Sequence, residues 1–505
     1  MIRSLLSRIL PIHKLTWWER YFWWLLAGAA VIFMVISLSI GLHQSVWFDE
    51  AYSIIVAKQP AAQLVHLTSL DTHPPLYYLL LKAWASMFGW SEFALRSLSV
   101  LAAGAALFVG GVFVKRVFGI RVALLAIPFV VLAPFLLRYG FEIRMYSLAS
   151  LIGIAATYVL VRAWQTKPSR ERLALYALYA VLVALGMYTL YYLALLWIAH
   201  VVWLVWMTRR EKQPLFKSLW LRAFLVSIVL FLPWLPAFIS QVSNGALAAI
   251  SQPMTIDNLV GIVSFGFVYQ PTWQLSAVMS LVVLFVITTL IVLSVHAFKL
   301  ISVKQRPYLV LLALYVAVPV AVLTLVSLAR PMYVERYLSH VLIGGMLFIG
   351  VVMAVNLAKA KKNVIVTGAA LVAVLVIGVM HLSQVGNFNF QRLQSPMVKQ
   401  AAALMKDCTK NATVFAADPY VAIELDYYLP DCQIQFYSAT DTLKGGYAPL
   451  SNSPLHVDEP ARELALSSKI YYVFYDQQTQ TMPSALHHST VKSFDSLHVA
   501  TFSVE

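Results

Sequence analysis

Charged residues are scarce in this chain. They make up 12% of its 505 residues, whereas 60% are hydrophobic and the mean hydropathy is +0.76. Soluble domains usually carry about a quarter charged residues, and a large soluble core would still need a polar shell. The composition therefore excludes a purely water-soluble protein. Apolar stretches of roughly 18 or more residues recur along the first three quarters of the chain, which indicates repeated crossing of a bilayer.

Other features are missing as well. The sequence has no glycine-rich loop for binding phosphate, and its C-terminal part has no cluster of metal-ligand residues. No small-residue cleavage pattern stands out near the end of the first apolar stretch, so we expect a retained signal anchor. The net charge of +15 does not indicate nucleic-acid binding, because the basic residues are spread over short loops rather than gathered on one face.

About eleven apolar segments are long enough to cross a membrane. The loops that this map assigns to the cytoplasm hold 22 of the 37 Lys and Arg residues, and the loops assigned outside hold seven. This bias follows the positive-inside rule and predicts an inside N-terminus and an outside C-terminus. We therefore predict an all-α polytopic membrane domain over residues 1–382, with an outside loop at 43–93. The predicted spans are about 21–42, 94–114, 121–138, 145–163, 173–188, 190–207, 220–240, 275–298, 308–328, 338–358 and 363–382.

The composition changes after residue 383, where charges return and short strand patterns alternate with helical ones. This pattern predicts a small α/β domain over residues 383–505, outside the membrane. Both cysteines of the chain, Cys408 and Cys432, fall in it. An oxidising compartment favours a disulfide between them, and two buried free thiols are the alternative. The expected helices are 396–407 and 419–429, and the expected strands are 413–417, 434–437, 470–475 and one or two within 491–504.

An acidic pair, Asp49 and Glu50, follows Trp-Phe at the outer end of the first predicted span. Asp49 would lie between water and lipid, where one carboxylate can take a proton from an incoming hydroxyl. Glu50 would point elsewhere on a helix, so the two should not share one proton. The alternative is that both are acidic residues of the kind that favours the first turn of a helix, here one starting near residue 50.

The same outside loop holds His73, which is followed by Pro74 and Pro75. The two prolines restrain the backbone and keep His73 out of a helix interior. Its imidazole could bind a phosphate or a metal, or could simply cap the helix that follows. That helix, the apolar run 79–88, is too short to cross the membrane, so we expect it to lie in the interface.

Two further motifs, residues 138–147 and 330–337, place arginines at the outer ends of helices. Glu142 could pair with either Arg138 or Arg144. Arg138 and Glu142 are four residues apart, which puts them on one face if the segment is helical. Arginine donates several hydrogen bonds in a fixed fork that suits phosphate, so both motifs are candidates for an anion site. The alternative for both is a structural ion pair near the lipid headgroups.

Together these motifs resemble the C-fold (GT-C) membrane glycosyltransferases, in particular the family 39-like group of protein O-mannosyltransferases, with the lipid A aminoarabinose transferases nearby. The resemblance covers roughly residues 20–380. Protein O-mannosyltransferases carry β-trefoil domains in a lumenal loop, for which this chain has no room, and this argues against protein O-mannosylation as the specific activity. The motifs that carry the resemblance are Asp49-Glu50, His73-Pro74-Pro75-Leu76 with Tyr78 and Lys82, the segment from Arg138 to Tyr146, and Glu335-Arg336-Tyr337.

The resemblance implies transfer of a sugar from a polyprenyl-phosphate donor to a lipid, glycan or protein acceptor, usually with inversion. The reaction would take place on the outer side of a prokaryotic plasma membrane. Such a donor partitions into the bilayer and needs no nucleotide pocket, which agrees with the missing phosphate loop. By the same analogy Asp49 is the general base, and Glu50 supports it or shapes the acceptor site. The residues that would face the donor phosphate or its sugar are His73, Arg138, Glu142, Arg144, Tyr146, Arg336 and Tyr337.

Some of the proteins that the chain resembles depend on a divalent metal. Asp49, Glu50 and His73 could supply ligands, so the sequence leaves the metal open.

A transporter or flippase for a lipid-linked sugar is the main alternative. It would place polar residues in broken helices at mid-membrane depth, whereas the charged residues here gather at the outer ends of the predicted spans. An assembly subunit whose C-terminal domain binds a partner is the third hypothesis, and it leaves Asp49 and the arginines unexplained. The pattern therefore favours an enzyme.

Overall fold

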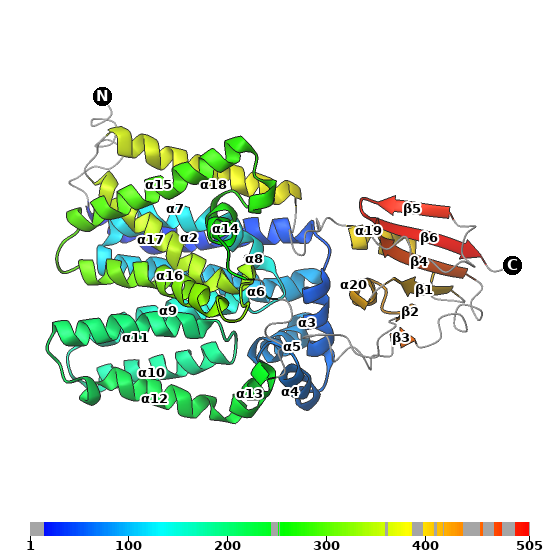
Figure 1. Cartoon of the computed structure of the whole chain (residues 1–505), viewed down its shortest axis with the longest axis horizontal. Helices are drawn as coiled ribbons and strands as arrows, with labels where there is room; N and C mark the ends of the chain where they lie inside the picture. The colour runs from blue at the N-terminus through cyan, green and yellow to red at the C-terminus, as the bar shows by residue number, and fades with distance from the viewer. Residues whose placement is uncertain are drawn as a thin grey trace. The chain divides into compact units, whose positions relative to one another are not determined.

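The structure is a computed structural model of the chain (Figure 1). It divides into two compact units. Unit 1 contains residues 1–40, 96–236 and 250–384, and unit 2 contains residues 41–95, 237–249 and 385–505. The outside loop predicted at 43–93 thus falls in the same unit as the C-terminal domain. The residues that the structure describes are 15–243, 251, 253–358, 362–385, 397–408, 412–417, 419–437, 455–457, 469–476 and 490–503.

Unit 1 is a bundle of helices. Within the described ranges, nine helices are long and apolar enough to cross a membrane, or ten if the bent pair α7 and α8 counts as one span. The predicted all-α membrane architecture is therefore confirmed. The helix bounds are α2 Leu15–Leu42, α6 Glu92–Phe118, α7 Ile120–Val131, α8 Pro134–Phe141, α9 Tyr146–Gln165, α10 Arg170–Met187, α11 Leu193–Arg210, α12 Leu219–Phe231, α14 Ile256–Phe267, α15 Ala277–Leu300, α16 Arg306–Ser327, α17 Ser339–Leu357 and α18 Lys362–Val385, with short 3-10 turns η1 Leu215–Lys217, η2 Leu232–Trp234, η4 Thr272–Gln274 and η5 Glu335–Leu338.

Two of the predicted spans differ from the structure. The segment 121–138 is not one helix but the pair α7 and α8, which meet at an angle of 66°. Pro134 opens α8, where its missing N–H and fixed φ are tolerated, and a proline there cannot continue the preceding helix. Helix α10 matches the segment predicted at 173–188, but its first three residues, 170–172, are all charged. This charge keeps α10 out of the set of clearly apolar spans.

Helix α17 packs against α7, α9, α15 and α16 within unit 1. Gly350 permits the close approach to α7, because a Cβ at this position would lie only 2.6 Å from the Cα of Ala126. Small residues allow helix backbones to approach in this way inside membranes. The turn η5 directly before α17 carries Arg336 and Tyr337, so the packing of α17 fixes where these side chains lie.

Before its C-terminal residues 385–505, unit 2 consists of short helices: α3 Phe48–Lys58, α4 Ala61–Leu70, α5 Leu76–Phe88 and most of α13 Leu235–Ser243. Helix α5 contains the predicted interfacial run 79–88 and begins one turn earlier. The side chain of Gln241 in α13 donates a hydrogen bond to the carbonyl of Thr68 at the end of α4, at 2.8 Å. This bond joins two segments that are far apart in the sequence.

The C-terminal part of unit 2 is the predicted α/β domain (Figure 1). Its sheet has the strand order β3-β2-β1-β4-β6-β5. Strands β1, β2, β3 and β4 run parallel to one another, and β6 runs antiparallel to both of its neighbours, β4 and β5. Side chains of α19 and α20 form an apolar core with one face of the sheet. The element bounds are α19 Met397–Leu404, β1 Ala412–Ala416, α20 Pro419–Tyr428, β2 Gln433–Tyr437, β3 His456–Val457, β4 Lys469–Tyr475, β5 Thr490–Phe494 and β6 Leu497–Ser503.

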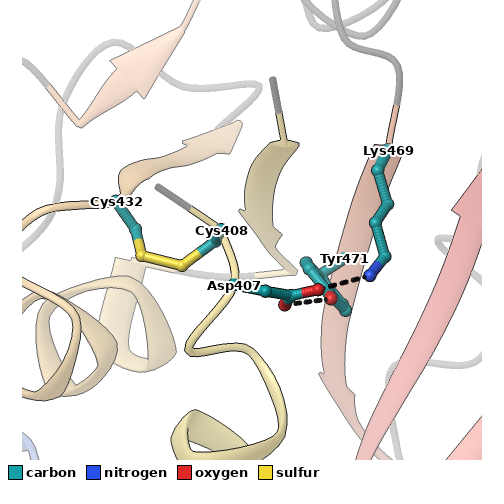
Figure 2. The surroundings of a disulfide bond; sticks show 5 residues. All are labelled: Asp407, Cys408, Cys432, Lys469 and Tyr471. Carbon is teal, nitrogen blue, oxygen red and sulfur yellow. Dashed lines mark hydrogen bonds and ion pairs between the residues drawn. A yellow bond between two sulfur atoms is a disulfide. The ribbon is translucent and has the colours of Figure 1, made fainter. Parts of the chain in front are cut away.

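The two cysteines form a disulfide, which was one of the two alternatives (Figure 2). Cys408 and Cys432 are bonded, with their Cα atoms 5.5 Å apart. Next to the bond, Asp407 accepts hydrogen bonds from the Lys469 ammonium at 2.8 Å and from the Tyr471 hydroxyl at 2.6 Å. These bonds lower the pKa of Asp407 below its ordinary value. The end of α19 is therefore attached both to the start of β2 and to strand β4.

Candidate active site

The predicted base and its neighbour lie on helix α3, in unit 2. Asp49 and Glu50 are the second and third residues of this helix, and both are buried. The Oε2 atom of Glu50 accepts a hydrogen bond from the backbone N–H of Trp47 at 3.3 Å, as a capping carboxylate does. Glu50 therefore stabilises the helix start. Asp49 lies about 100° away around the helix and faces a different direction.

His73 is buried in the loop that precedes α5, also in unit 2. The N-cap of α5 is Pro75, and no side chain caps this helix, so the capping role considered for His73 does not apply. Lys82 of α5 donates a hydrogen bond to the carbonyl of Ala57 in α3 at 3.4 Å. The helix that carries Asp49 and the helix that follows His73 are therefore packed together within one unit.

Arg138 and Glu142 form a buried ion pair in unit 1, with 3.0 Å between Arg138 Nη1 and Glu142 Oε2. Arg138 is one of the two arginines with which Glu142 could pair, and the spacing of four residues brings them together because α8 is helical up to Phe141 and Glu142 is its C-cap. The guanidinium also lies over the rings of Tyr139 and Phe141, with its Cζ 5.3 and 4.9 Å from the ring centroids. These contacts hold a positive charge in a site without exposure to water.

A row of three tyrosine rings connects this ion pair to Arg336. The rings of Tyr139 and Tyr146 are 5.2 Å apart, and those of Tyr146 and Tyr337 are 6.3 Å apart. The Cζ of Arg336 lies 5.6 Å from the ring of Tyr337. Unit 1 thus brings the sequence motifs 138–147 and 330–337 together through α8, the start of α9 and η5.

Arg144 and Arg96 are buried arginines of unit 1 in addition to Arg138 and Arg336. The backbone N–H of Arg144 donates to the carbonyl of Glu142 at 2.6 Å, and its own carbonyl accepts a hydrogen bond from Ser99 Oγ at 3.4 Å. The guanidinium of Arg96 lies 5.6 Å from the ring of Phe141, on whose face Arg138 also lies. In the sequence, Arg96 is only one of the seven basic residues of the loops assigned outside.

Tyr269 is a site residue that sequence reasoning missed. Burial raises its pKa, a hydrogen bond and the charge of Arg138 lower it, and Glu142 and Glu335 raise it further. Its hydroxyl therefore stays protonated beside the buried ion pair. The backbone φ of Tyr269 is +52°, an uncommon value for a residue with a side chain. It stands in a segment without charged residues, so no pattern in the sequence marks it.

The buried charges of each unit are mostly of one sign. Burying a charge is costly unless it is paired, hydrogen-bonded or serves a ligand. Among the described residues, unit 1 buries one glutamate, Glu142, and the four arginines Arg96, Arg138, Arg144 and Arg336. Unit 2 buries no Lys or Arg in its described part, but it buries the carboxylates Asp49, Glu50, Asp71 and Glu424.

Arginine guanidinium groups are of the kind that binds an anion such as phosphate, and carboxylates are candidate proton acceptors. That residues of both units act in one pocket stays a prediction.

A divalent metal was left open by the sequence. Within the part of the chain that the structure describes, no three His, Cys, Asp or Glu side chains come close enough to hold a metal ion. Asp49, Glu50 and His73 form no such group among these residues.

The chain is similar in structure to ArnT from Cupriavidus metallidurans. In the apo state the TM-score is 0.62 at 13% identity, and for the protein bound to undecaprenyl phosphate it is 0.60 at 15% identity. Both matches cover 96% of this chain and 98% of ArnT. The apo oligosaccharyltransferase of Archaeoglobus fulgidus matches with a TM-score of 0.50 at 12% identity, over 91% of this chain and 70% of that protein.

Residues 72–236 match the model of a sequence family described as dolichyl-phosphate-mannose-protein mannosyltransferase. A comparison with curated protein sequences finds no match. The predicted resemblance is confirmed: the chain has the GT-C fold of these membrane glycosyltransferases, and its residues 72–236 match the mannosyltransferase family model.

Proposed function

We propose that this protein transfers a sugar from a polyprenyl-phosphate donor to an acceptor hydroxyl on the extracytoplasmic side of the membrane, with inversion at the anomeric carbon. The acceptor is a lipid, a glycan or a protein. The observation that carries the proposal is the match to ArnT over nearly the whole of both proteins. One of the two matching ArnT structures is bound to undecaprenyl phosphate. The buried arginine group of unit 1 supports it independently, because it is suited to a lipid-linked phosphate.

The reaction needs one proton transfer and one bond exchange. The oxygen of the acceptor hydroxyl attacks the anomeric carbon, and the bond between that carbon and the phosphate oxygen breaks. Asp49 takes the proton of the hydroxyl as general base. Polyprenyl phosphate leaves with the bonding electrons, so its phosphate gains one negative charge while Asp49 becomes neutral. Burial of Asp49 at the start of α3 supports this role, because the carboxylate is held away from bulk water.

The charge that builds on the leaving phosphate must be stabilised. Arg138 and Arg336 supply fixed guanidinium groups on a common row of tyrosine rings, and such preorganised donors lower the barrier to charge development. We propose that His73 faces the same phosphate. Glu142 keeps Arg138 in place through its ion pair, while Arg144, Tyr146 and Tyr337 contact the sugar or the groups behind it. The proposal requires both units to act on one donor and one acceptor.

Replacing Asp49 by Asn tests the base. Asn keeps the size of the side chain but does not accept the proton, so turnover should fall by at least about a hundredfold. The purified full chain would be incubated with a panel of polyprenyl-phosphate sugars, mannose first, and released polyprenyl phosphate measured by mass spectrometry. Asp257→Asn is the matched control, because Asp257 is exposed and occupies the same second position in helix α14.

Two outcomes would contradict the proposal. Wild-type turnover by the Asp49→Asn variant would remove Asp49 as the base. Movement of the intact lipid-linked sugar across a vesicle membrane, without release of polyprenyl phosphate from any member of the panel, would favour the flippase instead. The mass of the glycosylated product identifies the acceptor class.

A further inference from the structure

Three polar residues of unit 2 form a connected network between the C-terminal domain and the segment that leads into α3. The Lys399 ammonium lies 2.9 Å from Glu92 Oε2. The Tyr428 hydroxyl donates to Glu92 Oε1 at 2.7 Å and accepts a hydrogen bond from the backbone N–H of Val46, also at 2.7 Å. Bonds to charged partners are the stronger kind of hydrogen bond. The network therefore fixes the backbone three residues before Asp49.

A second set of contacts acts on the same segment. The backbone N–H of Lys399 donates to Ser45 Oγ at 3.1 Å, and its ammonium donates to the carbonyl of Leu42 at 3.3 Å. The ring of Tyr420 in α20 packs edge-on against Phe48, the first residue of α3, with 4.4 Å between the centroids. Residues on both sides of the α3 N-cap are thus held by α19 and α20.

The two helices that make these contacts are fastened to each other. Cys408 comes four residues after the end of α19, and Cys432 comes four residues after the end of α20. Their disulfide joins the two segments that follow the C-terminal ends of these helices, and Figure 2 shows the bond. Helices α19 and α20 also share the apolar core of the domain. The C-terminal domain therefore presents both helices to the α3 segment as one rigid surface.

We infer that Glu92, Lys399 and Tyr428 are positioning residues for Asp49. They hold the start of α3, and with it the carboxylate, at a fixed place and angle. This inference rests on the proposed function, because it gives the C-terminal domain a part in the same reaction. A displacement of about 1 Å of a catalytic group can cost roughly a hundredfold in rate, so holding the helix start has a measurable effect.

Turnover is the first measurement. Lys399→Met and Tyr428→Phe should each lower kcat by about tenfold, with the donor KM changed less than about twofold, because the base is displaced and the phosphate site is not. Lys399→Arg should retain most of the turnover, since it keeps the charge and the reach to Glu92. Lys406→Met is the control, because Lys406 is an exposed lysine of the same domain.

Hydrogen exchange gives a readout that does not depend on activity. The Val46 amide is protected by the Tyr428 hydroxyl, so Tyr428→Phe should speed exchange in the peptide that covers residues 43–48 of the full-length protein. The same change should leave exchange in strand β4 unaltered. A variant that merely destabilises the C-terminal domain would speed exchange in both places.

The outcomes separate this inference from the proposed function. If the wild type transfers sugar and Asp49→Asn does not, while Lys399→Met and Tyr428→Phe match the wild type in kcat and in exchange at Val46, the positioning role is overturned and the function stands. If no sugar is transferred by the wild type, the proposed function fails. The exchange at Val46 then still decides whether the domain holds the start of α3.

Discussion

Arg138 is a charged residue whose side chain is fully buried. Its guanidinium is paired with Glu142 and lies over two aromatic rings, so its burial is offset by contacts on several sides. Removing one partner of a buried pair leaves the other uncompensated and costs about 3–5 kcal/mol. Arg138→Ala would therefore change stability and donor binding together. A variant that keeps the charge isolates the effect on the donor.

Arg138→Lys is that variant. Lysine keeps the positive charge beside Glu142 but loses the planar fork that binds phosphate with two parallel hydrogen bonds. We expect the donor KM to rise about tenfold and the melting temperature to change little, and Arg336→Lys should behave alike. Steady-state kinetics and a thermal unfolding scan measure both quantities. Arg209→Lys, an exposed arginine in the last turn of α11, is the control. An unchanged donor KM in Arg138→Lys would remove Arg138 from the phosphate site.

Part of this site could be predicted residue by residue. The spacing of Arg138 and Glu142 makes them one of two possible pairs for Glu142, because any helical segment brings residues four apart onto one face. Glu92 and Tyr269 could not be found this way. Each acts through partners that are distant in sequence, Lys399 in one case and Arg138 in the other, and only the tertiary fold brings them together.

The Cys408–Cys432 disulfide links secondary-structure elements. It joins the segment after α19 to the segment between α20 and β2. It closes a stretch with a sequence separation of 24 residues. In the chain-entropy model such a bridge contributes about 3 kcal/mol to the stability of the oxidised form. We expect the double change Cys408→Ser and Cys432→Ser to raise hydrogen-exchange rates throughout α19, α20 and β2, and to leave α17 unchanged. Equal protection of α19 in both proteins would contradict this.

Elements were predictable to different degrees, for physical reasons. Strands β1, β2 and β4 appear within one residue of the expected ranges, because a buried strand is a short apolar run with sharp ends. Hydropathy located the segment 121–138 but not its division, since it measures apolar length and ignores the hydrogen bonds that Pro134 interrupts. Helix α14 was not predicted at all, because its twelve residues are too few to read as a span.

At the scale of the whole molecule, the proposed reaction depends on the side of the membrane on which unit 2 lies. The distribution of Lys and Arg predicts that the C-terminal domain is outside and that the turn after α11 is inside. The apolar helices of unit 1 agree with an integral membrane protein and say nothing about its orientation. The polyprenyl donor can reach Asp49 from the outer leaflet only if this orientation is correct.

Thiol labelling in intact cells tests the orientation. The chain has two cysteines and both are in the disulfide, so a new cysteine is the only free thiol of the protein. Lys492→Cys places it on the exposed strand β5, and Lys212→Cys places it in the exposed turn after α11. A membrane-impermeant maleimide should label the first variant directly and the second only after the membrane is permeabilised. The reverse pattern would put Asp49 on the cytoplasmic side, where an extracytoplasmic acceptor could not reach it, and the proposed reaction would have to be abandoned.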